Sequence, residues 1–148
     1  MAKCIIRKFR VILHATFHIR TVLDQAKGIA NYIMTNTKIP EDHIPYWDYD
    51  APKIPNEPCD ASAAAITASA LFDLQEFVLE KKAQMIAYAE SILHRLSSDA
   101  YLAEYGKNQG FILKHSVGNI HTGEENGKPL NYADHYFLEA LSKWKNLE

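Results

Sequence analysis

The residues with the clearest chemical potential lie in the proline-rich stretch PYWDYDAP, residues 45–52. Asp48 and Asp50 stand two positions apart, and Trp47 precedes them directly. A carboxylate that exchanges a proton, beside an aromatic ring that stacks on a sugar, is a combination used by glycosidases. The same residues are also typical of a turn in which carboxylates accept backbone N–H groups. The turn is the favoured interpretation, and only Trp47 is kept as a candidate sugar contact.

A second group of polar residues crowds the glycine-bearing stretch LKHSVGNIHTGEENGKP, residues 113–129. Such a loop presents hydrogen-bond donors to a carboxylate or to sugar hydroxyls when it lies at the mouth of a helical scaffold. The alternative is a solvated loop whose polar groups satisfy its own backbone, and both interpretations stay open. The candidate substrate-binding residues are Trp47, Lys114, His115, Ser116, Asn119 and Thr122.

Other chemistry is poorly supported by the spacing of the reactive residues. A zinc site wants ligands at regular local spacing, and neither an HExxH motif nor a nearby cysteine pair accompanies His115, His121 and His135. A Ser116–His115–Asp134 triad lacks the GxSxG turn that presents a nucleophile. We therefore assign no metal ligand and no catalytic residue.

Composition indicates one globular domain and argues against nucleic acid and membranes as partners. The chain has 148 residues, 47% of them hydrophobic, with a net charge of −2 and two cysteines without CxxC spacing. This charge gives no general attraction to nucleic acid or anionic lipid, and no apolar run reaches the roughly 20 residues of a membrane span. The basic start of the chain lacks a clear cleavage site. We expect free thiols and a cytoplasmic or periplasmic protein.

Helical spacing recurs along the chain and predicts an all-α fold with long connecting loops. Thr21 is a plausible N-cap for a helix that ends near Asn36, and five prolines make residues 37–60 a connector. Asp60 then caps a helix through residue 79 whose first turns are small or apolar all round, which predicts burial.

The second half of the chain repeats this alternation of helix and connector. A one-sided helix follows residue 80, residues 97–130 form a second connector, and Asn131 caps a last helix with an apolar stripe. A weaker helix is expected at residues 5–17. Buried and one-sided helices in alternation indicate inner and outer layers of stacked helical hairpins.

Three blocks resemble a known family: HIPYWDYDAPKIPNEPCDASAAAITASALFDL, GFILKHSVGN and LNYADHYFLEAL. In this order and spacing they are similar to the C-terminal portion of unsaturated glucuronyl hydrolases, glycoside hydrolase family 88. The resemblance covers about Leu23 to Leu141, which is roughly the last third of a family member. It implies a partial six-hairpin α/α barrel (α/α toroid), with inner helices after Asp60 and Asn131 and outer helices after Thr21 and Glu80.

The resemblance also implies an activity and its limits. Family members hydrate the C4=C5 bond of an unsaturated uronyl sugar without metal or organic cofactor, and their catalytic aspartates precede the region matched here. We therefore expect residues 21–148 to be the C-terminal part of such a domain, inactive alone. Residues 1–20 match poorly, which suggests a truncated or frame-shifted reading frame.

The loop after LKHSV resembles the family loop that contacts the leaving sugar. Its sulfate-binding positions would be Asn119, Thr122 and Glu124, and because Glu124 reverses the charge we expect no sulfate preference. Some members have an aromatic residue at the position of Gly118, and an arginine is common at that of Cys59.

Two alternatives stay open. One is a non-catalytic helical module that binds sugar or a partner chain, with self-association through exposed inner-helix faces at residues 61–71 and 136–144. The other is a relative that acts on unsaturated rhamnogalacturonyl fragments.

Overall fold

The structure is a computed structural model that describes residues 19–120, 122 and 125–147. The helix expected at residues 5–17 lies outside the described residues, as does most of the segment 1–20.

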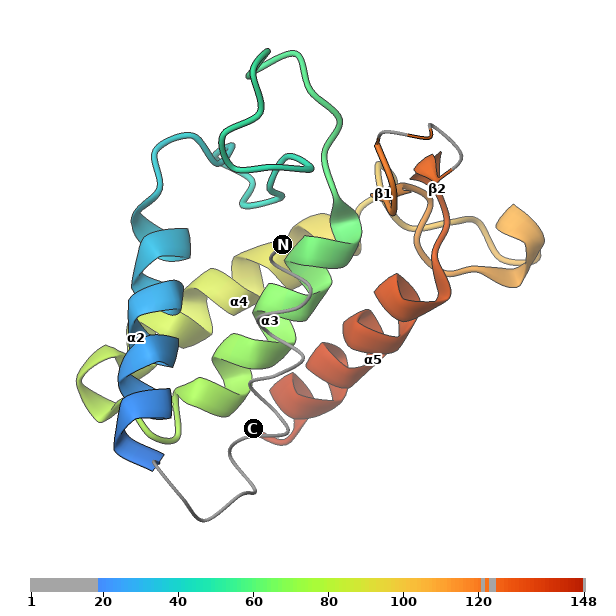
Figure 1. The fold of residues 1–148 in the computed structure, drawn as a ribbon. Coiled ribbons are helices and arrows are strands. Elements are labelled where there is room, and N and C mark those ends of the chain that lie inside the picture. Colours follow the sequence, from blue (N-terminus) through green and yellow to red (C-terminus); the bar gives the residue numbers. More distant parts are fainter. Residues whose placement is uncertain (1–18, 121, 123–124, 148) are drawn as a thin grey trace.

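Four long helices dominate the described part of the chain: α2 (Ile19–Thr35), α3 (Ala61–Leu74), α4 (Lys82–Leu96) and α5 (Asn131–Lys145). They alternate in direction, so α2 and α4 end where α3 and α5 begin (Figure 1). The long connectors, residues 36–60 and 97–130, both lie at this loop end of the bundle, and the short link 75–81 lies at the other. The all-α fold is confirmed.

The connectors contain little regular structure. Two short helical turns, η1 (Leu79–Lys81) and η2 (Asn108–Gly110), accompany a two-stranded antiparallel sheet of β1 (Ser116–Val117) and β2 (Asn126–Lys128). After η2 the chain becomes extended at Phe111, and Leu113 forms an isolated bridge with Leu102 before β1 begins.

Helix α3 is the centre of the fold because it has no polar face to turn toward water. Alanines at 61, 64, 65 and 68 are fully buried, and their small side chains let neighbouring helices approach closely. α3 packs against α5, α4 and α2. Asp60 caps it as predicted, since its side chain accepts the N–H of Ser62. The prediction of an exposed face at residues 61–71 is wrong, because most of these residues are buried.

The other helices bury one side each, as their apolar periodicity predicts. α4 buries a single side, as expected of a one-sided helix; the buried residues are Met85, Ala89, Ile92, Leu93 and Leu96. α5 buries Ala133, Phe137 and Ala140, while Tyr136, Leu141 and Trp144 pack partly buried against the same core.

Three predicted helix boundaries are wrong. Thr21 lies inside α2, so it cannot be the N-cap, which must leave helical dihedral angles. Asn131 is the first residue of α5; the cap is extended Leu130, whose carbonyl accepts the N–H groups of Ala133 and Asp134. α3 ends at Leu74, well before residue 79, because the chain turns there to bury Val78.

None of the helices in the described ranges is long and apolar enough to cross a bilayer.

Candidate functional site

The carboxylates of PYWDYDAP are engaged in the local structure of the first connector. Asp48 Oδ1 accepts the backbone N–H of Asp50 at 2.8 Å, a side-chain turn of the kind predicted. Asp50 Oδ1 lies 2.5 Å from Lys38 Nζ in an exposed ion pair. Both residues are exposed, whereas the general acid of a glycosidase typically lies in a desolvated pocket.

Trp47 is half-buried and fixed at its nitrogen. Its Nε1 donates to Glu57 Oε2 at 2.9 Å, and its backbone N–H donates to the carbonyl of Pro58. Glu57 Oε1 in turn accepts the N–H of Lys53, which closes a turn across the connector. A ring held in this way has a defined orientation, which a stacking platform needs.

Arg95, near the end of α4, joins the two connectors at the loop end. Its Nε donates to Asp42 Oδ2 at 2.7 Å, and its guanidinium carbon lies 5.3 Å from the centre of the Tyr101 ring. Asp42 belongs to the first connector and Tyr101 to the second. Sequence reasoning missed this residue, because a basic side chain in a last helical turn is ordinary.

Asp60 links the first connector, α3 and the second connector. Its Oδ1 accepts from Ser62 N at 3.0 Å, Ser62 Oγ at 2.6 Å and Val117 N at 3.1 Å. The preceding residue, Cys59, forms an isolated bridge with Tyr46, next to Trp47. These contacts connect the neighbourhood of Trp47 with the start of the second polar stretch.

The candidate residues of the second connector differ in accessibility. Lys114 is partly exposed and its Nζ donates to the carbonyl of Asp99 at 2.6 Å, while His115 is exposed. Ser116 is fully buried, and its Oγ has no hydrogen-bond partner among the described residues. A sugar could reach Ser116 only if the hairpin moved.

The tip of the hairpin carries the exposed Asn119 and Thr122, where Asn119 Oδ1 lies 3.4 Å from the N–H of Thr122. Gly118 donates its N–H to the carbonyl of Glu125 at 2.9 Å. A Cβ at Gly118 would lie 1.9 Å from Glu125 Oε2, so a side chain there requires Glu125 to move. His121 and Glu124 lie outside the described residues.

Asp134 holds a backbone segment in place and is not part of a catalytic Ser–His–Asp triad. Its Oδ2 and Oδ1 accept the backbone N–H groups of Ile112 and Leu113, at 2.8 and 2.9 Å. Asn108 Nδ2 donates to the carbonyls of Phe111 and Leu113 on the same segment. These contacts fix the extended segment that leads to Lys114. No local sequence pattern predicts these bonds, because Asp134 lies more than 20 positions from Ile112 and Leu113 in the sequence.

The environment of Arg95 shifts two pKa values upward, those of Cys59 and Tyr101. Burial raises the pKa of Cys59, as do Asp42 and Asp60 to a smaller degree, although Arg95 opposes them. Burial also raises the pKa of Tyr101. A thiol whose pKa is raised is a weak nucleophile, so this cysteine is poorly suited to catalysis.

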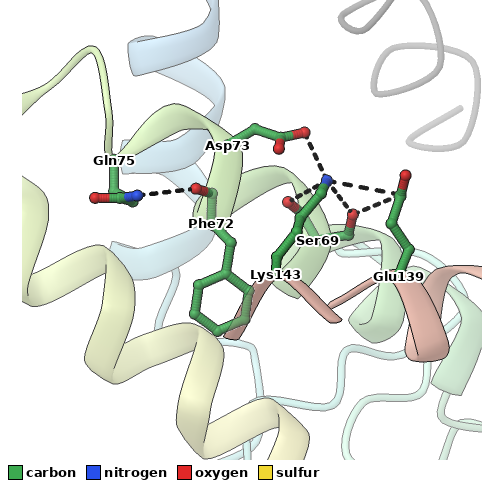
Figure 2. A network of polar contacts seen from close by, with 6 residues as sticks. All are labelled: Ser69, Phe72, Asp73, Gln75, Glu139 and Lys143. Carbon is green, nitrogen blue, oxygen red and sulfur yellow. Dashed lines mark hydrogen bonds and ion pairs between the residues drawn. The ribbon is translucent and has the colours of Figure 1, made fainter. Parts of the chain in front are cut away.

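No group of three His, Cys, Asp or Glu residues that could hold a metal ion occurs in the described part of the chain. A network of polar side chains joins α3 to α5 (Figure 2). Lys143 Nζ donates to Ser69 Oγ at 2.8 Å and to Asp73 Oδ2 at 2.7 Å, and Ser69 Oγ donates to Glu139 Oε2 at 2.7 Å. Ser69 is only 3% exposed, so this network joins helices and offers no accessible nucleophile.

Comparison with known proteins identifies relatives over most of the chain. An unsaturated glucuronyl hydrolase of Formosa agariphila is 42% identical over 125 residues, which are 84% of this chain and 31% of that protein. No family model matches the chain.

Solved structures give the same result. The crystal structure of an unsaturated glucuronyl hydrolase specific for heparin has a TM-score of 0.91 at 42% identity, covering 99% of this chain and 39% of that one. A structure described as a UGL variant with dGlcA-Glc-Rha-Glc has a TM-score of 0.73 at 26% identity, covering 82% of this chain and 32% of that one.

The helices and the loop end thus match part of the α/α barrel found in these glycoside hydrolases. More narrowly, the chain is a homologue of the unsaturated glucuronyl hydrolases over the stretch it shares with them, which confirms the resemblance found in the sequence. It spans about a third of the length of the curated relative, 31%, consistent with a C-terminal portion of the barrel.

Proposed function

We propose that these 148 residues supply the C-terminal part of the barrel, and one side of the substrate site, in a hydrolase of unsaturated glucuronyl oligosaccharides. The observation that carries this proposal is the match to the heparin-specific hydrolase, with a TM-score of 0.91 at 42% identity. At that level of similarity the loop end of this chain corresponds to a loop end of the relative.

The loop end provides contacts suited to an acidic sugar. His115 is exposed, and Lys114, whose ammonium carries three donors, uses one of them for the Asp99 carbonyl. Both lie in the second connector with the exposed amide of Asn119 and hydroxyl of Thr122. Trp47 presents an aromatic ring from the first connector. Lys114 and His115 are our candidates for the uronate carboxylate, and the other residues for hydroxyl groups and stacking.

The chemistry proposed for the parent enzyme is hydration of the C4=C5 bond. A carboxylic acid delivers a proton to C4, water adds at C5, and the resulting hemiketal opens to release the leaving sugar. Asp48, Asp60 and Asp134 are candidates by residue type, but each already accepts backbone N–H groups. Because the family resemblance implies catalytic aspartates that precede the matched region, we place the proton donor outside this polypeptide and expect no turnover by it alone.

Loss of absorbance from the C4=C5 chromophore tests this expectation. The purified chain, shown to be helical by circular dichroism, should consume an unsaturated glucuronyl disaccharide no faster than a protein-free control. Consumption above that control would place a functional acid within these residues and contradict the assignment.

A non-catalytic, partner-binding role is the second candidate, and one observation favours it. Leu138 is 52% exposed on α5, between the buried Phe137 and Ala140. A single exposed leucine is common on protein surfaces. It favours contact here because the family resemblance makes α5 an inner helix of the barrel, against which further helices would pack. Sedimentation equilibrium measures this directly: concentration-dependent association is expected, and a monomer at all concentrations would argue against it.

A further inference from the structure

We propose that Asp60 is a positioning residue that fixes the β1–β2 hairpin to the start of α3. The residue is 4% exposed, and a single carboxylate oxygen, Oδ1, accepts from Ser62 N, Ser62 Oγ and Val117 N. The first of these bonds caps the helix. The bond to Val117 spans 57 positions of sequence and joins the helix to the candidate substrate loop.

Capping alone does not account for this arrangement. An N-cap needs one acceptor for the N–H of the second or third helical residue, and Ser or Asn serves as well as Asp. The additional acceptance from Val117 N satisfies a buried backbone donor, which would otherwise cost free energy. A bond to a carboxylate is stronger than one to a neutral acceptor, so the joint resists opening.

The hairpin is anchored on its β1 side, where Ser116 and Val117 are both buried and Val117 donates to Asp60. Val117 is buried at 6% exposure, but all three residues of β2 are exposed. The strands are short and their register is irregular, with Ser116 opposite Lys128 and Val117 opposite Asn126. Asn119 and Thr122 are carried on the segment between these strands. Their position therefore follows that of Val117.

This inference rests on the proposed function only for what the hairpin contacts; the joint itself is a property of the chain. Hydrogen exchange followed by NMR measures it without any sugar, so a failure of the proposed function would leave the result intact. The reporting amides are Val117 and Gly118, and amides within α3 report on the helix.

Three substitutions test the joint: two change the acceptor, Asp60, and one removes the donor, the N–H of Val117. Asp60→Ser keeps a good N-cap but shortens the side chain, so exchange at Val117 and Gly118 should accelerate roughly 10- to 100-fold while α3 amides change little. Val117→Pro removes the donor and leaves the cap intact, so Gly118 should lose protection and α3 should not. Asp60→Asn retains an acceptor of the same length and should restore most of the protection at Val117.

The proposal is overturned if Asp60→Ser leaves Val117 and Gly118 as protected as in the parent chain. It is equally overturned if Asp60→Asn loses as much hairpin protection as Asp60→Ser, because then length and acceptor geometry are not what matters. Should Asp60→Ser unfold the whole chain, Val117→Pro decides: unchanged protection of Gly118 would reject the joint.

Discussion

Asp48 and Asp50 differ in what they contribute at the scale of single residues. Asp48 accepts the N–H of Asp50 within a turn, whereas Asp50 forms an ion pair with Lys38 in which the side chains are 72% and 55% exposed. A backbone contact of this kind is worth more than an exposed ion pair.

We expect Asp48→Ala to lower the free energy of unfolding by about 1 kcal/mol, because the N–H of Asp50 loses its acceptor. Asp50→Ala should change it by less than about 0.5 kcal/mol. Urea unfolding followed by circular dichroism compares the two variants. Equal effects would show that the turn bond is not the stabilising contact.

His43 makes the stability of the chain depend on pH. Burial lowers the pKa of its imidazole, against the opposing charge of Asp42, and the ring stacks 4.1 Å from that of Tyr88. Burial of Tyr88 raises the pKa of its own hydroxyl to about 12, so its charge does not change near neutral pH.

Because the folded pKa of His43 lies below the unfolded value, the unfolded chain binds more protons as the pH falls. The stabilisation is present above the unfolded pKa and is lost as the pH falls below about 6.5 toward the folded pKa. His43→Asn, which suits the φ of 60° at this position, should flatten the pH dependence of urea midpoints between pH 7 and 5. The matched control is exposed His135→Asn. An unchanged slope in His43→Asn would contradict the assignment.

The residues that hold the loop end could be predicted only in part. Asp60 follows from a local pattern, since a cap precedes its helix by one position, and the turn at Asp48 follows from the same kind of local rule. The bonds of Asp134 to Ile112 and Leu113, and of Arg95 to Asp42, join residues 21 to 53 positions apart. No local rule predicts such a pairing, because the fold brings these segments together.

At the scale of elements, side chains of the helices hold the connectors in place at the loop end. Asp134 of α5 is one such side chain. It is partly buried at the start of α5 and accepts two backbone N–H groups of the extended segment. Removing the carboxylate leaves both donors without this partner.

Asp134→Ala is therefore expected to lower the free energy of unfolding by about 2 to 4 kcal/mol. Asp99→Ala, at an exposed position that offers its backbone carbonyl to Lys114, is the control and should cost less than about 0.5 kcal/mol. Thermal and urea unfolding both measure the difference. A small effect of Asp134→Ala would mean that the extended segment is fixed by other contacts.

The pairing of α3 with α5 depends on the network around Lys143 (Figure 2). The side chain of Lys143 is 23% exposed and that of Glu139 is 15% exposed. The contribution of this network to stability should therefore lie between that of an exposed and that of a fully buried ion pair. Lys143→Ala should lower the free energy of unfolding by about 1 to 3 kcal/mol, while Lys145→Ala, at an exposed position on the same helix, should have little effect. Equal unfolding midpoints for the two variants would contradict a role in helix pairing.

Helix identity follows from the sequence more reliably than helix ends. The buried side of α4 is the set given by its apolar spacing, and α3 is buried because its sequence offers no polar face. The start of α2, the end of α3 and the start of α5 differ from expectation because each is set by the backbone dihedral angles of the chain at that point. Extended Leu130 and the turn before Val78 are set by tertiary packing, to which side-chain preference is only a weak guide.

At the scale of the whole molecule, the chain covers 39% of the heparin-specific hydrolase and superposes on it with a TM-score of 0.91. Inner helices α3 and α5 and outer helices α2 and α4 give two adjacent hairpin units of the barrel, with their connectors at one end (Figure 1). We infer that the remaining barrel of such an enzyme supplies the proton donor and this part supplies loop contacts.

A hybrid enzyme measures this division of roles most directly. Residues 19–147 replace the superposed segment of the heparin-specific hydrolase, and the loss of C4=C5 absorbance of an unsaturated glucuronyl disaccharide is followed. The account predicts that the hybrid consumes the disaccharide, that the Asp48→Asn and Asp50→Asn hybrids remain active, and that the hydrolase without the segment is inactive. A hybrid that folds with the circular dichroism of the parent yet fails to consume the disaccharide would contradict the account.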